Sequence, residues 1–187
     1  DELAGGFRFF VRPLTRTRQT MAHLARALAL AEARVHVEPT VKELGFGVWE
    51  GKPFWELKAS PVYPADAESR YGWRPEGGES YEDGSARLAQ WLAELDGPAV
   101  VVAHGAIGRC LIGQLAGLPA SEIVGTSGRI AERLPDVTPS ERTRLALICG
   151  ITDTMVAKIE ATCPPATSTS AGPPPLYGIC VIFTFAM

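Results

Sequence analysis

The stretch "AVVVAHGAIGRCL" at residues 99–111 decides the fold class. It begins with a continuous apolar run of alanine and valine, which is typical of a strand buried on both faces of a parallel sheet. His104 ends that run, and Gly105 opens a helical pattern. In α/β proteins, ligands bind beyond the carboxyl ends of strands, where the N-terminus of the next helix favours an anion. His104 is therefore predicted either to bind an anion such as phosphate or to be a buried histidine that hydrogen-bonds a neighbouring loop.

Strand and helix patterns alternate along the rest of this region. Residues 7–11, "FRFFV", and residues 34–39, "RVHVEP", are predicted strands. A helix is predicted between them, a second helix begins at a Ser80–Asp83 capping box, and a third follows Gly105. The buried faces of these helices are expected to carry Met21, Leu24, Ala25 and Leu28, then Leu88, Trp91, Leu92 and Leu95, then Ile107, Leu111, Ile112 and Leu115. This order of elements predicts an α/β sandwich.

Residues 41–79 form a long excursion within this pattern. The segment is rich in Gly, Pro and aromatic residues, and only a weak helix is predicted near residues 53–59. Long irregular segments in compact domains are usually functional or disordered.

The character of the chain changes after residue 125. Residues 126–160 are predicted to be a divergent helical appendage, with Thr138 and Glu141 as a capping box. Residues 161–187 combine a Pro/Ser/Thr-rich linker with a short apolar tail that could form a final strand. The predicted organisation is thus a domain over residues 1–125 followed by these two segments.

Composition excludes several classes of function. The net charge of −3 argues against a general nucleic-acid binder, which needs a basic face. No stretch reaches the roughly 20 apolar residues that a membrane helix requires. The four cysteines lie far apart without zinc-ligand spacing, so we expect no metal and free thiols in a cytoplasmic protein, the alternative being a disulfide among Cys149, Cys163 and Cys180.

Four charged side chains are candidates for chemistry. Arg16 and Arg18 follow the first strand, where a guanidinium can hold two phosphate oxygens, although a single arginine in a first helical turn is usually just solvated. Glu43 and Glu50 flank a Gly-Phe-Gly turn in "VKELGFGVWEG". A partly desolvated carboxyl beside an aromatic ring suits a general acid, whereas two loop carboxylates in water would carry no chemistry.

Four motifs in order carry a family resemblance. "PLTRTRQT", "KELGFGVWEG", "PEGGES" and "VVAHGAIGR" resemble the histidine phosphatase superfamily, which includes the cofactor-dependent phosphoglycerate mutases. The resemblance covers residues 7 to about 119. It implies a phosphoglycerate mutase-like, three-layer α/β/α sandwich with a mostly parallel sheet.

The resemblance also implies roles for individual residues. In such proteins one histidine attacks the phosphoryl group and forms a phosphohistidine, while a second histidine and two arginines hold the phosphoryl oxygens. By motif position Arg16 would be a phosphate clamp, Glu43 the proton donor to the leaving alcohol, and His104 the second histidine, assisted by the Gly105 amide. Arg18 and Glu50 have no such match and are expected to be surface or structural residues.

The sequence departs from the family at its nucleophile. It contains no Arg-His-Gly motif, and we expect structural roles for its other two histidines, His23 and His36. The expectation is that the first strand, the nucleophile and the first phosphate arginine are missing from this chain, so that the fold is incomplete at the N-terminus. Arg12 stands where the family usually has a small residue, and it would either crowd the site or attract phosphate.

The function predicted from the resemblance is a phosphomonoesterase acting on a small phosphorylated metabolite through a phosphohistidine, with its nucleophile absent from this chain. The alternatives are a non-catalytic fragment or pseudoenzyme that only binds phosphate, and a phosphoglycerate mutase-like phosphotransferase. No cofactor, nucleic acid or membrane partner is expected. A homodimer is possible, because a sheet lacking a strand exposes an edge.

Overall fold

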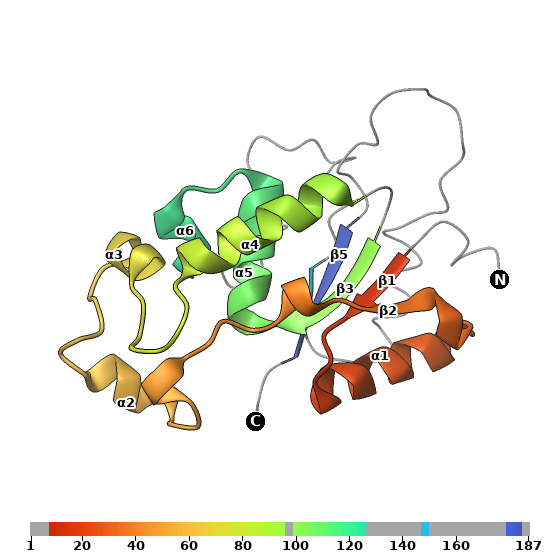
Figure 1. Ribbon diagram of the computed structural model, residues 1–187, viewed down its shortest axis with the longest axis horizontal. Coiled ribbons are helices and arrows are strands. Elements are labelled where there is room, and N and C mark those ends of the chain that lie inside the picture. Colours follow the sequence, from red (N-terminus) through yellow and green to blue (C-terminus); the bar gives the residue numbers. More distant parts are fainter. Residues whose placement is uncertain (1–7, 96–98, 126–146, 150–178, 185–187) are drawn as a thin grey trace. The chain divides into compact units, whose positions relative to one another are not determined.

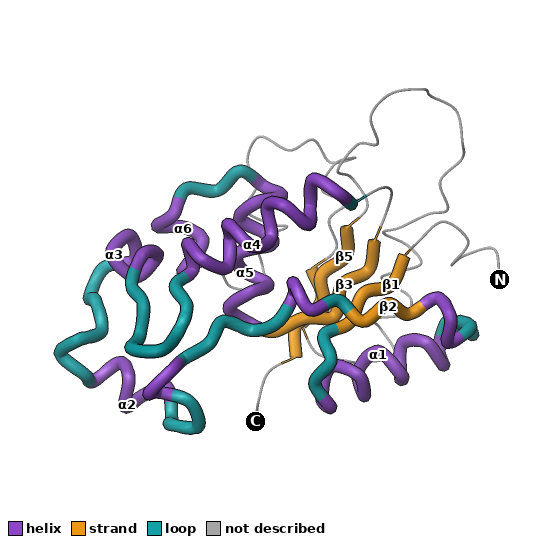
Figure 2. The backbone as a smooth tube through the Cα atoms, in the orientation of Figure 1, coloured by secondary structure: helices purple, strands orange, loops and turns teal. Residues whose placement is uncertain are grey.

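The computed structural model describes residues 8–95, 99–125, 147–149 and 179–184, and a parallel sheet runs through it. The described strands lie in the order β2-β1-β3-β5-β4, and every pairing between them is parallel (Figures 1 and 2). Their bounds are Arg8–Val11 for β1, Val35–Val37 for β2, Ala99–His104 for β3, Leu147–Cys149 for β4 and Ile179–Thr184 for β5. The carboxyl ends of parallel strands point the same way, so β1 and β3 end at one edge of the sheet.

The chain divides into two compact units, and the first contains the sheet together with helix α1, Thr15–Ala27. In this unit α1 packs on β1, β3 and β5. The core between helix and sheet consists of Phe9, Val11, Met21, Leu24, Val100 and Val102. The strand residues in this set are spaced by two and the helix residues by three, as expected for one face of each element. Burying one such side chain contributes about 1.5–3 kcal/mol.

The second unit is helical and contains most of the excursion predicted from the sequence. Its helices are α2 (Phe54–Ala59), α3 (Ala67–Gly72), α4 (Tyr81–Glu94), α5 (Gly105–Ala116) and α6 (Ala120–Gly125), of which α5 crosses from the first unit after Gly105. Helix α3 packs against α4 and α6. At the start of α4 the Ser80 Oγ accepts from the Asp83 N–H at 3.1 Å, and Asp83 Oδ2 accepts from the Ser80 N–H at 2.8 Å. The predicted capping box is confirmed.

Short 3-10 turns join these elements. They are η1 (Glu32–Arg34), η2 (Pro39–Val41) and η3 (Gly47–Trp49). Among the described residues, no helix is both long and apolar enough to cross a bilayer.

The α/β class with a parallel sheet is confirmed, and so are the strands, α1, α4 and α5. All six residues of β3 are buried, as the apolar run predicted. Helix α3 was not predicted, although Asp66 caps it by accepting from the Ser69 N–H at 2.7 Å. That Asp-x-x-Ser spacing was the local signal for its start.

The predicted helix within residues 126–160 is wrong at Leu147–Cys149, which forms strand β4. This apolar run pairs with β5, and main-chain pairing within the sheet outweighs the weak local preference for a helix. Within the apolar tail, Ile179–Thr184 form β5, which pairs with β3, so β3 has a strand on each side. The Thr138–Glu141 capping box and the Pro/Ser/Thr-rich linker lie outside the described residues.

Candidate active site

His104 ends β3 and is buried, with only 1% of its surface exposed. Strand β1 lies beside β3, with Val11 in register with Val102, so the residues after Val11 and after Val102 emerge at the same edge of the sheet. On the other side, His104 is in register with Thr184 of β5. The sequence therefore placed His104 correctly at the carboxyl edge.

Arg16 meets His104 at this edge. Its Nε–H donates to His104 Nδ1 at 3.2 Å, across a sequence separation of 88 residues. A neutral imidazole that accepts at Nδ1 carries its proton on Nε2, so the Nε2–H is a donor in this tautomer. Arg16 itself is exposed to solvent, and its guanidinium is therefore accessible to a ligand.

The first turn of α1 fixes the backbone of Arg16. The hydroxyl of the fully buried Thr17 donates to the carbonyl oxygens of Arg12 and Leu14, at 2.8 Å each. The Arg12 N–H in turn donates to the Val102 carbonyl at 3.4 Å. These bonds tie the start of α1 to the ends of β1 and β3, which sets where the Arg16 side chain begins.

Glu43 lies in the second unit, where its carboxylate binds the first turn of α5. Glu43 Oε1 accepts from the Ile107 N–H at 2.9 Å, and Oε2 accepts from the Ala106 N–H at 3.2 Å. Oε1 also accepts from the N–H of Leu44 at 3.1 Å. A carboxylate suits this position, because the N-terminus of a helix carries partial positive charge and N–H groups without helical partners. Gly105, the first residue of α5, directly follows His104 in the chain.

Backbone contacts hold the loop that carries Glu43 against a second loop, which contains Glu76 and Glu79. The Glu79 N–H donates to the Gly45 carbonyl at 2.8 Å, and the Val48 N–H donates to the Glu76 carbonyl at 3.0 Å. Gly47 has a φ of +52°, and a Cβ there would lie 1.9 Å from the Glu76 oxygen. A Cβ at Gly78 would likewise lie 2.5 Å from the Gly45 oxygen, so one glycine of each motif is needed for the two backbones to pack this closely.

Two carboxylates add side-chain hydrogen bonds to these loop contacts. Glu79 Oε2 accepts from the Gly45 N–H at 3.0 Å and from Arg87 Nη2 at 3.4 Å. Glu50 Oε1 accepts from the Phe46 N–H at 2.7 Å and closes the Gly-Phe-Gly turn. Glu50 thus has a structural contact here, and Glu79 is a functional-site candidate that sequence reasoning treated only as part of a rim motif.

A half-buried polar pair lies between α4 and α5, beside the buried Cys110. Arg109 Nη1 donates to the Tyr81 hydroxyl at 2.9 Å. Burial raises the pKa of Tyr81, and the Arg109 guanidinium opposes that rise. Burial also raises the pKa of the Cys110 thiol to about 12. A thiol with that pKa is almost fully protonated at neutral pH, so Cys110 is a poor nucleophile. No local sequence signal identified this pair.

The remaining candidates lie apart from these contacts. Arg18 is exposed on α1, as is His23. His36 is exposed on β2, with its ring 5.7 Å from that of Phe10. Arg12 is half-buried directly after β1.

These features define a phosphoglycerate mutase-like α/β protein. The chain belongs to the histidine phosphatase superfamily, branch 1, whose family model matches residues 7–129.

Two relatives of known structure are mycobacterial proteins. A glucosyl-3-phosphoglycerate phosphatase in complex with inorganic phosphate is 27% identical with a TM-score of 0.54, and the match covers 65% of this chain and 63% of that one. A protein described as mycobacterial hydrolase 1 is 27% identical with a TM-score of 0.55, over 64% of this chain and 61% of that one.

A curated relative comes from Caenorhabditis elegans. A 6-phosphofructo-2-kinase/fructose-2,6-bisphosphatase is 31% identical over 131 residues, which are 66% of this chain and 27% of the relative. The chain therefore spans only about a quarter of that relative and less than two thirds of the mycobacterial structures.

Proposed function

We propose that this protein is a phosphatase-type domain that binds the phosphoryl group of a small phosphorylated metabolite through Arg16, His104 and the Gly105 amide. The observation that carries the proposal is the Arg16–His104 hydrogen bond at the carboxyl edge of the sheet. Family membership and the named phosphatases among the relatives support the same chemistry. Those relatives are named for glucosyl-3-phosphoglycerate and fructose-2,6-bisphosphate, which favours a phosphorylated sugar compound as substrate.

Phosphoryl transfer depends mainly on positioned positive charge and hydrogen-bond donors around the phosphoryl oxygens. Arg16 supplies a permanent cation in a planar fork. His104, with its proton on Nε2, supplies a neutral donor from a buried position. The Arg16–His104 bond orients both groups before a ligand arrives, which lowers the cost of ordering them on binding.

In this proposal Glu43 is the proton donor to the leaving alcohol. Both of its oxygens accept backbone N–H groups of α5, so one oxygen must exchange such a bond for the leaving-group oxygen. Glu43 takes up a proton from solvent on that oxygen; as the P–O bond breaks, this proton passes to the leaving alkoxide, and the carboxylate returns to the helix N-terminus. Transfer also needs a nucleophilic histidine to form the P–N bond and water to break it, and no histidine of this sequence is assigned the first of these roles.

A second candidate function is phosphate binding without turnover. It is favoured by one observation: the sequence has three histidines, and of these only His104 lies at the end of a buried strand. His104 is here the second histidine, so the nucleophile is assigned to no residue of this chain. A phosphoglycerate mutase-like transfer would use the same phosphate contacts and differ only in the acceptor.

Isothermal titration calorimetry with orthovanadate and with inorganic phosphate tests the phosphate site. We expect Arg16→Ala and His104→Ala each to weaken binding at least tenfold, since each removes a contact to the anion. Arg18→Ala and His36→Ala are matched controls and are expected to leave affinity unchanged. The site would be refuted if the control variants weakened anion binding as much as Arg16→Ala and His104→Ala do. It would also be refuted if the unaltered protein bound neither vanadate nor phosphate.

Hydrolysis of p-nitrophenyl phosphate separates the two candidates. Turnover that Glu43→Gln reduces, with vanadate affinity retained, supports the phosphatase. Vanadate binding without any turnover supports the binding-only alternative.

A further inference from the structure

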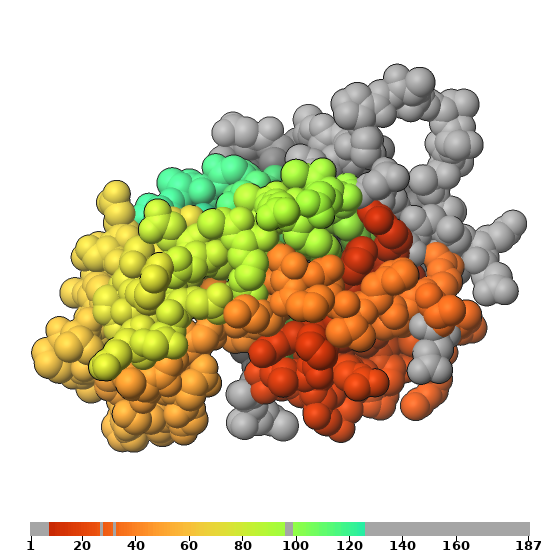
Figure 3. Space-filling view, viewed as in Figure 1, coloured from red at the N-terminus to blue at the C-terminus, as the bar shows by residue number. Residues whose placement is uncertain are grey.

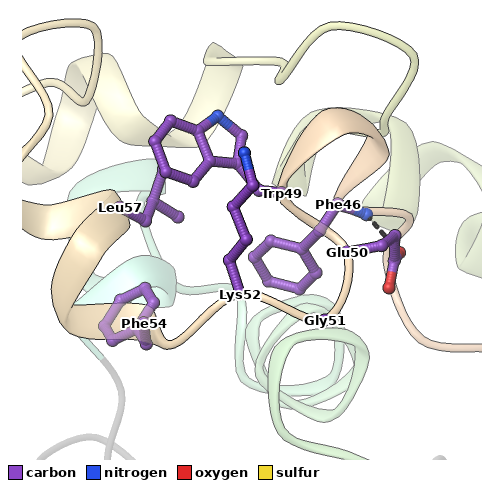
Figure 4. Close-up of a pocket in the computed structure, with 7 residues that line it drawn as sticks. All are labelled: Phe46, Trp49, Glu50, Gly51, Lys52, Phe54 and Leu57. Atoms are coloured by element: carbon purple, nitrogen blue, oxygen red, sulfur yellow. Dashed lines mark hydrogen bonds between the residues drawn. The ribbon is translucent and has the colours of Figure 1, made fainter.

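The second unit contains a hollow of about 210 Å³ beside the Gly-Phe-Gly turn. The side chains and backbone that line it belong to Phe46, Trp49, Glu50, Gly51, Lys52, Phe54 and Leu57 (Figure 4). An apolar cavity of roughly 150 Å³ can hold one benzene molecule, whereas sites for drug-sized ligands measure roughly 300–1,000 Å³. The hollow therefore has room for a single six-membered ring with a small substituent.

Aromatic and aliphatic side chains supply most of the walls. In Figure 4 they surround the side chain of Lys52, and they are those of Phe46, Trp49, Phe54 and Leu57. Leu57 is only 3% exposed, whereas Phe54 is 53% exposed. The α2 segment, which carries both, lies at the surface of the molecule (Figure 3). A small ligand can therefore reach the hollow from solvent and meet apolar walls inside it.

A short turn places a cation on one of these walls. The Lys52 N–H donates to the Trp49 carbonyl at 3.2 Å, so the chain turns back on itself between the two residues. Lys52 Nζ lies 4.6 Å from the centroid of the Trp49 ring, in a cation–π contact. An ammonium has three N–H donors, so Lys52 can stack on the ring and still donate to an anion.

The other charged lining residue does not oppose this charge with a free carboxylate. Glu50 Oε1 accepts from the Phe46 N–H at 2.7 Å, and the Glu50 side chain points away from that of Lys52 (Figure 4). Lys52 is thus the charged lining side chain that faces the hollow. A ligand with a single negative charge matches it.

The scarcity of polar lining groups decides which kind of ring fits. A sugar ring would bury several hydroxyl groups, each of which needs a polar partner, and the lining side chains offer only Lys52 and the bonded Glu50. An aromatic ring needs no such partner. It also gains from edge and face contacts with other aromatic rings, which Phe46, Trp49 and Phe54 provide.

We propose that this hollow is a binding site for a small aromatic monocarboxylate, with the ring among Phe46, Trp49 and Phe54 and the carboxylate on Lys52 Nζ. A single ammonium suits a monoanionic carboxylate, whereas phosphate is usually held by arginine or by several donors. The site is built entirely from the second unit and goes beyond the proposed phosphatase function.

NMR titration of the whole protein with three probes tests the proposal. Benzoate has both the aromatic ring and the carboxylate, benzyl alcohol has the ring alone, and cyclohexanecarboxylate has the charge alone. We expect benzoate to bind about threefold tighter than either, because an exposed ion pair and an aromatic contact each contribute about that factor. Lys52→Met keeps the aliphatic stem and should remove the advantage of benzoate over benzyl alcohol only.

Lys58→Met is the matched control. Lys58 also lies over an aromatic ring, that of Phe54 at 5.5 Å, but it does not line the hollow. We expect this variant to keep the full preference for benzoate. Equal affinity for benzoate and benzyl alcohol, or equal losses in the two lysine variants, would overturn the proposal.

The tryptophan indole resonances locate the bound ring. Trp49 lines the hollow, whereas Trp55 is 68% exposed and does not line it. Benzoate in the hollow should shift the Trp49 indole N–H more than that of Trp55, and the reverse order would indicate stacking on the open surface and refute the site.

An Arg16→Ala variant excludes binding of benzoate at the phosphate site, because a guanidinium can also hold a carboxylate. Benzoate affinity retained in this variant supports the hollow as the site, whatever becomes of vanadate binding. Benzoate affinity lost with Arg16 would overturn the proposal, so failure of the phosphate site and failure of this site give different results.

Discussion

The β3–α5 segment and the loop that carries Glu43 present a functional side chain in different ways. His104 is positioned by its own neighbours in sequence, because a buried strand ends at it and a helix begins at the next residue. Glu43 is positioned by residues more than thirty positions away, through the backbone of Gly45 and Gly47 against that of Glu76 and Glu79. The first arrangement tolerates change in surrounding loops, whereas the second depends on single glycines and one carboxylate.

The two segments differ in how many contacts hold each of them in place. Strand β3 is held by two neighbouring strands and a buried apolar core, so no one contact decides its position. The Glu43 loop has few buried apolar side chains of its own, of which Leu44 is one. Its conformation is set by a small number of polar and steric contacts, so a single substitution should have a large effect there.

The largest effect is expected at Gly47. Gly47→Ala places a Cβ 1.9 Å from the Glu76 oxygen at a φ of +52°, so the loop that carries Glu43 must move away from the loop that carries Glu76. We expect a loss of about 3 kcal/mol in the free energy of unfolding, from left-handed strain together with the lost loop contacts. Urea unfolding followed by tryptophan fluorescence measures it.

Gly51→Ala is the control for this prediction. Gly51 also has a positive φ, +74°, but a Cβ there meets nothing within 4 Å. Strain alone should then cost about 1 kcal/mol. Similar losses at the two glycines would show that loop packing contributes little.

A smaller effect is expected at Glu79. Glu79→Ala leaves the Gly45 N–H and the Arg87 guanidinium without this acceptor, at a cost of about 1–3 kcal/mol in stability. Glu76→Ala is the comparison, because Glu76 is exposed and contributes its main-chain oxygen to the contacts between the two loops. A Glu76 variant as unstable as the Glu79 variant would contradict the role of the Glu79 carboxylate.

The smallest effect is expected at the capping box of α4. Hydrogen bonds from Ser80 lower the pKa of the Asp83 carboxyl. Its contribution is therefore present at neutral pH, above the unfolded pKa near 3.9, and is lost as the pH falls through the lower folded value. Asp83→Asn should reduce stability by a few tenths of a kcal/mol at pH 7 and flatten the acid side of the stability curve.

Thermal unfolding between pH 2 and 7 checks this. Glu82→Gln is the control, because Glu82 is exposed in the same turn. An unchanged acid profile in the Asp83 variant would mean that its carboxyl is not linked to folding.

These two arrangements explain which elements of the fold could be predicted from the sequence. The strand of valines, the capping box and the helix after Gly105 rest on local patterns and were predicted correctly. Strand β4 and the position of β5 beside β3 rest on pairing between distant segments, which no local pattern reports. Helix α3 has a local cap, but it lies in a segment too rich in turn residues for that signal to stand out.

The candidate site divides in the same way. Arg16, His104 and Glu43 were selected by motif, yet the motifs do not show that Arg16 Nε donates to His104 Nδ1 or that Glu43 binds the α5 N–H groups. Glu79, the Tyr81–Arg109 pair and the Lys52–Trp49 contact have no signal of their own, since each depends on which loops or helices come together.

The amino-acid sequence by itself determined the parallel α/β class, the end of β3 at His104 and the membership of the chain in its superfamily. These properties follow from hydrophobic periodicity, caps and ordered motifs, all of which act over a few residues. Only the tertiary structure decided which groups meet: Arg16 with His104, Glu43 with the first turn of α5, and Lys52 with Trp49. Hydrogen bonds and ring contacts act over a few ångströms in space, and distance along the chain does not specify which residues come that close.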